Sequence, residues 1–149
     1  MPSNRCGVIR VDRVVVNKSR REMLLLCGES VLRSYRIALG RDPLGPKARE
    51  GDGKTPEGHY VIDRRNPKSA YHLSLHISYP TDAQRARARE LGIDPGCDIM
   101  IHGLPNGVGA AEKGHPQTDW TRGCIAVTDE EMDEIWALVA DGTPIQINP

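Results

Sequence analysis

The chain has 149 residues, a length that fits one domain with a hydrophobic core of its own. Its 20 basic and 20 acidic side chains cancel, so there is no overall positive field to hold a nucleic-acid backbone, and nucleic acid is not expected as a partner. The longest apolar run, Met23 to Cys27, is strand-sized and far short of the ~20 residues of a transmembrane helix. We therefore expect a single soluble domain over residues 1–149 without a transmembrane segment.

The N-terminus and the cysteines carry few further signals. Residues Met1 to Asp12 lack the basic-then-apolar order of a secretory signal, so no export signal is visible. The four cysteines could pair in three ways, but their spacing forms neither a dense disulfide framework nor paired Cys-x-x-Cys metal hooks. Cys6, Cys27 and Cys97 have no adjacent motif, and we expect them to be structural or free thiols.

The first third of the chain predicts β-sheet. Short β-branched and apolar stretches, 8–16 and 21–39, are broken by Asn17-Lys18 and Gly28-Glu29, as is typical of antiparallel strands and hairpins. An irregular segment rich in glycine, proline and charge follows over 40–58, and then a strand over 59–63. Long ordered loops in small domains tend to be functional, so the irregular segment is of interest.

Residues 71–79 alternate strictly, which predicts a strand with one core face and one polar face. Tyr71 begins the core face, and His72, Ser74, His76 and Ser78 form the polar face. Helices are predicted over 81–91 and over 128–139, where Thr128 and Glu131 form a capping box. Short strands are expected at 98–101, 125–127 and 144–147, with a glycine-rich loop at 103–120. The fold class is therefore α+β, mostly β, with two short helices.

The run Thr121-Arg122-Gly123-Cys124-Ile125 places a cysteine directly after a glycine, where a loop meets an apolar strand. There the sulfur can face a cleft, and nearby backbone N–H groups can converge on an anion. A thiol has an ordinary pKa of about 8.5 and needs a base or positive surroundings to become a nucleophilic thiolate. His102, after the strand 98–101, is the best candidate for this base. Spacing alone does not establish the pair, because a single cysteine is more often a small buried hydrophobe.

Three blocks taken together resemble the L,D-transpeptidase catalytic domain, also called the YkuD-type domain. They are Gly51-Asp52-Gly53-Lys54-Thr55-Pro56-Glu57-Gly58-His59-Tyr60, Ile101-His102-Gly103 and Gly123-Cys124-Ile125, in the order of the family and over nearly the whole chain. The resemblance implies a β-sandwich of mixed sheets around a catalytic cleft, with Cys124 as nucleophile, His102 as base and no metal or other cofactor. It also implies a role in cell-wall biogenesis and cell shape, in the periplasm or cell envelope.

The resemblance further implies peptidoglycan stem peptides as the substrate. Enzymes of this family attack the bond after the third residue of a tetrapeptide stem, usually a diaminopimelate, expel D-Ala and pass the acyl group to an amine. In this chain His102 would take the proton of Cys124, and backbone N–H groups near Gly123 and Cys124 would hold the oxyanion. The acceptor can be a second stem, a protein lysine or water, and the sequence does not choose among them.

The sequence departs from the family pattern beside the cysteine. Many members have Ser-His-Gly-Cys and an arginine two residues after the cysteine, whereas this chain has Thr121-Arg122 before Gly123-Cys124 and Ala126 after it. Thr121 can replace the serine hydroxyl, and Arg122 can supply positive charge for a substrate carboxylate. The other candidate substrate-binding residues are Gly103, His72, Ser74 and Trp120, although Trp120 fits packing equally well.

The remaining histidines and the glycine-rich block have simpler interpretations. His72 and His76 are only half of a zinc site, so ordinary strand residues are expected and no metal site is predicted. His59 and His115 are expected to face solvent without a role. The block 51–55 lacks the first glycine of a phosphate-binding loop, so a nucleotide site is not predicted and a structural turn is.

The leading functional hypothesis is a cysteine-dependent L,D-transpeptidase. Its alternatives are an L,D-carboxypeptidase or amide hydrolase of the same fold, a secreted antibacterial effector that attacks a competitor's wall, and a non-catalytic wall-binding module. Cys124 and His102 argue against the last alternative, because binding alone needs no nucleophile. The sequence does not indicate the oligomeric state.

Overall fold

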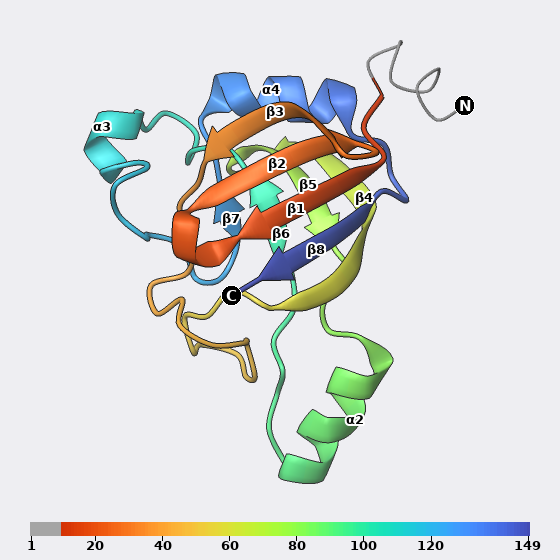
Figure 1. Cartoon of the computed structure of the whole chain (residues 1–149). Coiled ribbons are helices and arrows are strands. Elements are labelled where there is room, and N and C mark those ends of the chain that lie inside the picture. The colour runs from red at the N-terminus through yellow and green to blue at the C-terminus, as the bar shows by residue number, and fades with distance from the viewer. Residues whose placement is uncertain (1–9) are drawn as a thin grey trace.

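The computed structural model describes residues 10–149 and is built mainly of β-strands (Figure 1). In chain order the elements are β1 (Arg13–Asn17), the 3-10 helix η1 (Lys18–Arg20), β2 (Glu22–Cys27), β3 (Ser30–Arg36), β4 (Gly58–Ser69), β5 (His72–Ile77), α2 (Asp82–Leu91), β6 (Met100–His102), α3 (Ala110–Lys113), β7 (Ile125–Ala126), α4 (Asp129–Leu138) and β8 (Pro144–Asn148). The predicted mostly-β fold class is confirmed, with the single turn α3 in addition to the two expected helices.

The strands form one mixed sheet in the order β3-β2-β1-β8-β4-β5-β6-β7. Neighbouring strands are antiparallel except for the parallel pairs β1–β8 and β6–β7. After β3 the chain returns to the opposite edge, where Ala38 pairs with Ala126 and Gly40 pairs with Thr121. The two edges of the sheet therefore meet, and the sheet curls around a single core.

The core follows from the alternation of apolar residues along the strands. Val14 and Val16 of β1 and Met23 and Leu25 of β2 are fully buried, because successive side chains of a strand point to opposite faces. Helix α4 lies across one end of the curled sheet (Figure 1) and buries Met132 and Ile135. Its predicted capping box, from Thr128 to Glu131, is present. Burying these apolar groups is the main favourable term in folding.

Helix α2 is placed differently. It projects away from the sheet (Figure 1) and buries only Ala88 of its ten residues. A capping box between Thr81 and Gln84 and the left-handed Gly92 define its two ends. Its stability therefore depends more on its caps and helix-forming residues than on packing. No helix within residues 10–149 is long and apolar enough to cross a membrane.

The β4–β5 region differs from the prediction in two ways, and β6 begins at Met100 rather than at residue 98. Strand β4 continues beyond residue 63 to Ser69, because its second half pairs with β5 while its first half pairs with β8. The register shifts between Asn66 and Ser69, which accommodates the proline at position 67 within the strand. The turn that follows contains Tyr71, which is 39% exposed, so its predicted place on the core face is wrong.

Candidate active site

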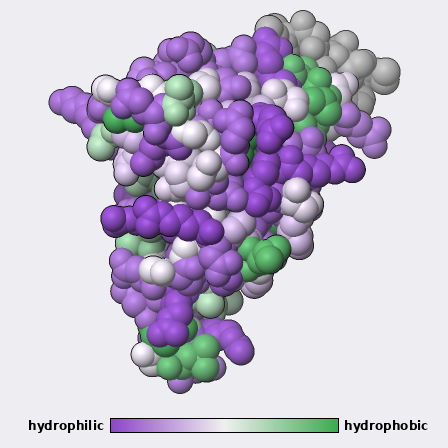
Figure 2. Space-filling model, turned by 90° about the vertical axis from the view of Figure 1, so that its left-hand side faces the viewer, coloured by the Kyte–Doolittle hydropathy of each residue, from purple (hydrophilic) through white to green (hydrophobic). Residues whose placement is uncertain are grey.

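A cavity of about 1070 Å³ opens where four segments of the chain meet. Its walls are the loop 41–53, the β4–β5 hairpin, the segment 96–102 that leads into β6, and the loop 113–124 that leads into β7. Figure 2 shows that the face bearing α3 is mostly hydrophilic. Six of the predicted site residues line the cavity: Cys124, His102, Arg122, Thr121, Ser74 and Trp120. The other three, Gly123, Gly103 and His72, are not among its lining residues.

Thr121 holds the turn that carries the cysteine. Its hydroxyl donates to the Cys124 carbonyl oxygen (2.7 Å) and accepts from the Gly123 N–H (3.0 Å). The Thr121 side chain is buried, so its hydroxyl is committed to the turn, and the structure does not support its predicted role in binding substrate. The Gly123 N–H was one expected oxyanion donor, but it already has this partner. The Cys124 N–H is then the candidate donor in this turn.

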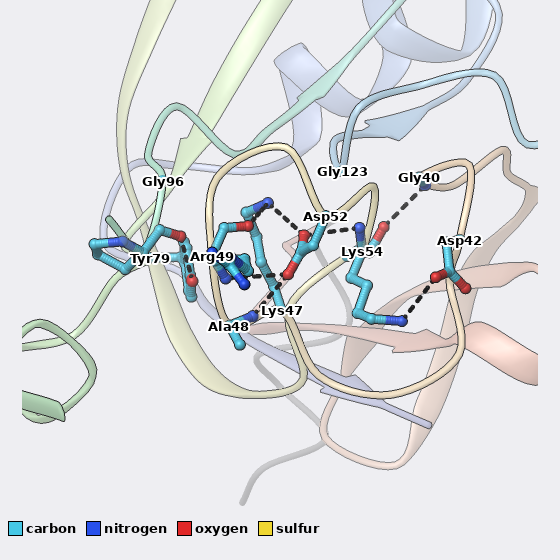
Figure 3. Close-up of polar contacts among 12 residues, drawn as sticks. Gly40, Asp42, Lys47, Ala48, Arg49, Asp52, Lys54, Tyr79, Gly96 and Gly123 are labelled. Carbon is cyan, nitrogen blue, oxygen red and sulfur yellow. Dashed lines mark hydrogen bonds and ion pairs between the residues drawn. The ribbon is translucent and has the colours of Figure 1, made fainter. Parts of the chain in front are cut away.

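Gly123 is required here for steric reasons. Its φ of 141° is rarely adopted by other residues, and a Cβ would lie 2.8 Å from the Lys54 carbonyl oxygen and 3.2 Å from the Ile99 side chain. Gly40 is equally tight, since a Cβ there would lie 2.1 Å from the Gly53 carbonyl oxygen. The glycine-rich block therefore packs directly against the cysteine turn, and Figure 3 shows Gly40, Lys54 and Gly123 close together.

Asp52 organises this supporting loop. Its carboxylate accepts from the N–H groups of Ala48 (2.9 Å), Arg49 (3.1 Å) and Lys54 (3.1 Å), and it pairs with the buried Lys47 ammonium at 2.9 Å (Figure 3). Burial opposes ionisation, but these donors outweigh it and lower the pKa of Asp52 to about 2. The predicted structural turn is thus built around the Asp52 carboxylate, and no role was predicted for this residue.

Cys124 is a thiol in this structure. Its Sγ lies 3.4 Å from the Asp98 carbonyl oxygen and donates to it. Burial raises the pKa of Cys124 to about 11, and the nearby Asp98 charge adds to the shift. The Met100 N–H and the Lys47 charge oppose it without reversing it. At neutral pH almost all molecules therefore carry the protonated sulfur.

His102 is a neutral imidazole. Its ring is buried, and Nδ1 lies 2.7 Å from the Gly103 carbonyl oxygen. Burial lowers the pKa of His102 to about 4, although this hydrogen bond favours the charged form. A carbonyl oxygen can only accept, so Nδ1 carries the proton and Nε2 is the basic nitrogen.

The two side chains come from neighbouring strands. β6 and β7 are parallel, with Ile101 opposite Ile125 and His102 opposite Ala126. Cys124 directly precedes β7. Its sulfur hydrogen-bonds to the Asp98 carbonyl oxygen and the His102 imidazole to the Gly103 carbonyl oxygen, rather than to each other. Catalytic hydrogen bonds are often formed only after substrate binds, so this geometry is compatible with a nucleophile and its base.

Aromatic rings surround His102. Tyr71 stacks on it, with ring centroids 4.4 Å apart, and Trp120 lies 5.8 Å away in a tilted arrangement. Both aromatic residues line the cavity. Tyr71 was missed as a site residue because strand alternation placed it in the core. Tyr71 is the first residue of the predicted strand 71–79, and a strand end can instead belong to the preceding turn.

His72 and Gly103 serve the packing of α4 rather than the cavity. His72 Nε2 lies 2.6 Å from Asp133 Oδ1, an interaction that raises the pKa of His72, and its Nδ1 lies 3.9 Å from Asp129. A Cβ at Gly103 would lie 2.6 Å from Asp129 Oδ1. The predicted substrate-binding roles of His72 and Gly103 are therefore not supported by their placement. Ser74 is buried and donates to Ser69 Oγ at the cavity wall.

The other histidines and cysteines differ in their burial and bonding. His59 is exposed as expected, whereas His115 is buried, so its predicted solvent-facing position is wrong. Within residues 10–149, no group of three or more potential ligands is arranged to hold a metal ion. Cys97 is an exposed thiol in the cavity wall, while Cys27 is buried and disulfide-bonded instead of being a thiol. The prediction for Cys6 lies outside the described residues.

The curled mixed sheet is the fold of the L,D-transpeptidases. Solved structures with this fold include the L,D-transpeptidase of Xylanimonas cellulosilytica (TM-score 0.59, 14% identity, covering 94% of this chain and 61% of that one). They also include the helical cell shape determining protein Pgp2 of Campylobacter jejuni (TM-score 0.70, 24% identity, 92% and 47%). A third is Bd1075 of Bdellovibrio bacteriovorus (TM-score 0.61, 25% identity, 93% and 48%).

The chain belongs to the YkuD family, the L,D-transpeptidase catalytic domain, whose family model matches residues 11–147. The predicted family is therefore confirmed. The YafK protein of Escherichia coli is 34% identical over 111 residues, which are 73% of this chain and 37% of YafK. The chain thus spans little more than a third of that relative and about half of Pgp2.

Proposed function

We propose that this domain is a cysteine-dependent L,D-transpeptidase that acts on peptidoglycan tetrapeptide stems in the periplasm. The single observation that carries the proposal is that Cys124 and the neutral imidazole of His102 line one cavity from adjacent strands. A thiol and an unprotonated base that face the same cavity are the groups that acyl transfer through a thioester requires. Membership of the YkuD family supports the same chemistry.

The proposed reaction begins with an uncharged pair. When the carbonyl of the third stem residue binds beside the sulfur, His102 Nε2 accepts the thiol proton and the sulfur adds to the carbonyl carbon. The Cys124 N–H donates to the developing oxyanion. The tetrahedral intermediate then collapses, the bond to D-Ala breaks, and the imidazolium returns its proton to the leaving amine.

The second half of the reaction releases the enzyme. The amine of an acceptor attacks the thioester and passes a proton to His102, and the Cys124 thiol is restored. A second stem as acceptor gives a 3→3 crosslink, a protein lysine gives an attached protein, and water gives a tripeptide. Neutral imidazole serves as the base in both halves, which its buried position favours.

Substrate recognition is assigned to the charged and aromatic walls of the cavity. Arg122 and Arg41 are exposed there, and the stem peptide carries several carboxylates for them to bind. Arg41 follows Gly40 and its N–H donates to the Thr121 carbonyl oxygen (3.1 Å), so both arginines flank the cysteine turn. Arg41 and Arg122 are therefore the two cations that we assign to carboxylate binding beside Cys124.

The test is mass spectrometry of purified disaccharide-tetrapeptide after incubation with the wild type and with Cys124→Ala. Cys97→Ser is the matched control, because it removes the other thiol of the same cavity. The expected result is a dimer lacking one D-Ala, formed by the wild type and the control but not by Cys124→Ala. A tripeptide monomer alone would show a carboxypeptidase. No product with folded wild type would contradict the proposal and favour a wall-binding role.

A further inference from the structure

His115 and Trp120 form a buried hydrogen-bonded pair beside the cavity. The Trp120 indole Nε1–H donates to His115 Nδ1 at 3.1 Å, and the His115 side chain is only 5% exposed. An indole nitrogen can only donate, so His115 Nδ1 must be unprotonated and must act as the acceptor. The proton of the neutral ring therefore lies on Nε2.

Burial of the other ring nitrogen of His115 is energetically unfavourable. Nε2 is buried and has no hydrogen-bond partner within residues 10–149. A buried donor without an acceptor loses its interaction with water and gains nothing in return. The hydrogen bond from Trp120 is therefore the polar interaction that compensates for burial of the His115 ring.

Trp120 connects this pair to the proposed base. Its ring is 5.8 Å from the His102 ring and 6.3 Å from the Tyr71 ring, while Tyr71 stacks on His102 at 4.4 Å. The imidazole of His102 thus has aromatic rings around it and is 4% exposed. Displacement of Trp120 would open one side of this enclosure to water.

We propose that His115 is a positioning residue that holds Trp120 beside His102 and thereby keeps water away from the proposed general base. This inference rests on the proposed function for its catalytic consequence, whereas the contact itself is independent of it. His115 acts only through Trp120, because it does not line the cavity.

The protonation state of His115 controls the contact. Protonation would place an Nδ1–H opposite the indole N–H, and two donors cannot bond to each other. Burial lowers the pKa of His115, and the Glu131 carboxylate of α4 acts weakly in the opposite direction. The other charged or titratable groups nearby are His102 of β6 and Lys113 of α3, whose ammonium lies 5.0 Å from the Trp120 ring centre. The contact should therefore persist at neutral pH and break on the acid side.

The first measurement is the NMR signal of the Trp120 indole N–H as a function of pH, assigned with Trp136→Phe. The wild-type signal should have a hydrogen-bonded shift at neutral pH and should move in a single titration below pH 6.5. In His115→Asn the amide oxygen can accept in place of Nδ1, so the bonded shift should remain without the titration. In His115→Leu the shift should be that of an unbonded indole at every pH.

The second measurement is the pH profile of kcat/KM for the same variants. If water reaches His102 in His115→Leu, the acid limb should move upward toward the ordinary histidine pKa, and activity at pH 5.5 should fall about tenfold relative to the wild type. His115→Asn should match the wild type above the pH at which the Trp120 signal titrates, and below that pH it should lose less activity than the wild type, because the amide oxygen keeps the contact.

Two results for His115→Leu would overturn the proposal. One is a Trp120 signal that is identical in the wild type and in His115→Leu, and the other is an unchanged acid limb in that variant. A wild-type signal that does not respond to pH also counts against it, even if His115→Leu fails to fold. Failure of the proposed function would be recognised separately, because the indole signal requires no turnover.

Discussion

The resting state of Cys124 can be tested directly by its reaction with iodoacetamide. Only the thiolate is alkylated at an appreciable rate, so the rate reports the fraction of ionised sulfur. The alkylation rate is measured from pH 6 to pH 10 in a Cys97→Ser variant, which lacks the exposed thiol of the same cavity. Cys124 can be followed in the peptide that trypsin releases after Arg122, because no lysine or arginine follows in the sequence.

The expected magnitude follows from the pKa of about 11 to which burial raises Cys124. At pH 7 only about one molecule in 10⁴ then carries a thiolate, and the rate should rise about tenfold with each pH unit up to pH 10. A thiolate held by an imidazolium would behave differently, with a rate nearly constant across this range. The neutral state of His102 argues for the first behaviour.

The control is His102→Ala on the same background. Since the sulfur bonds to Asp98 and not to His102, the pH series should be nearly unchanged in this variant, while turnover should be lost. A wild-type rate that is independent of pH between 6 and 9, and that becomes pH-dependent in His102→Ala, would refute this description of the resting site.

Two further predictions concern stability. Gly123→Ala should lower the free energy of unfolding by about 1–3 kcal/mol for the backbone conformation, and by more for the clash with Lys54. The control Gly107→Ala has nothing near its Cβ and should lower it by only about 1–2 kcal/mol. Equal decreases of Tm in the two variants would contradict the steric argument. Burial lowers the pKa of His102 to about 4, so the folded state disfavours protonation of this ring. The stabilisation that neutral His102 contributes is therefore fully present above pH 6.5 and is lost as pH falls toward 4, which lowers the free energy of unfolding by about 3 kcal/mol in total. Urea unfolding of the wild type and of His102→Asn between pH 4 and 7 should therefore converge as pH falls, and parallel curves would contradict this.

Local patterns predicted much of the fold. Thr128 and Glu131 form the capping box that their spacing indicates, and α4 begins where it was expected. The apolar alternation of Leu75 and Ile77 also places these residues in the core. Such signals work because caps and strand faces depend on residues that are neighbours in the sequence. Cys124 and His102, by contrast, were paired through family resemblance, since their meeting depends on the parallel register of two short strands.

Contacts that follow no sequence periodicity explain what the sequence did not reveal. Tyr71 follows the apolar alternation of β5 but lies in the turn before it, so it leaves the core and stacks on His102. His115 lies in a loop, yet its side chain is buried and hydrogen-bonded to Trp120. Thr121 was predicted to contact substrate, and the sequence does not reveal that its hydroxyl closes the cysteine turn. In each case the decisive partner belongs to another segment or to a turn whose geometry no periodicity describes.

The protonation states at rest also constrain the order of events in the proposed reaction. Burial raises the pKa of the Cys124 thiol to about 11 and lowers the pKa of the His102 imidazole to about 4, so transfer of the proton between them before substrate binds is strongly unfavourable. Proton transfer should therefore accompany addition of the sulfur to the carbonyl, where the new bond and the Cys124 N–H stabilise the charge. The enclosure of His102 by Tyr71 and Trp120 favours this coupling, because it keeps the base unprotonated until the carbonyl arrives.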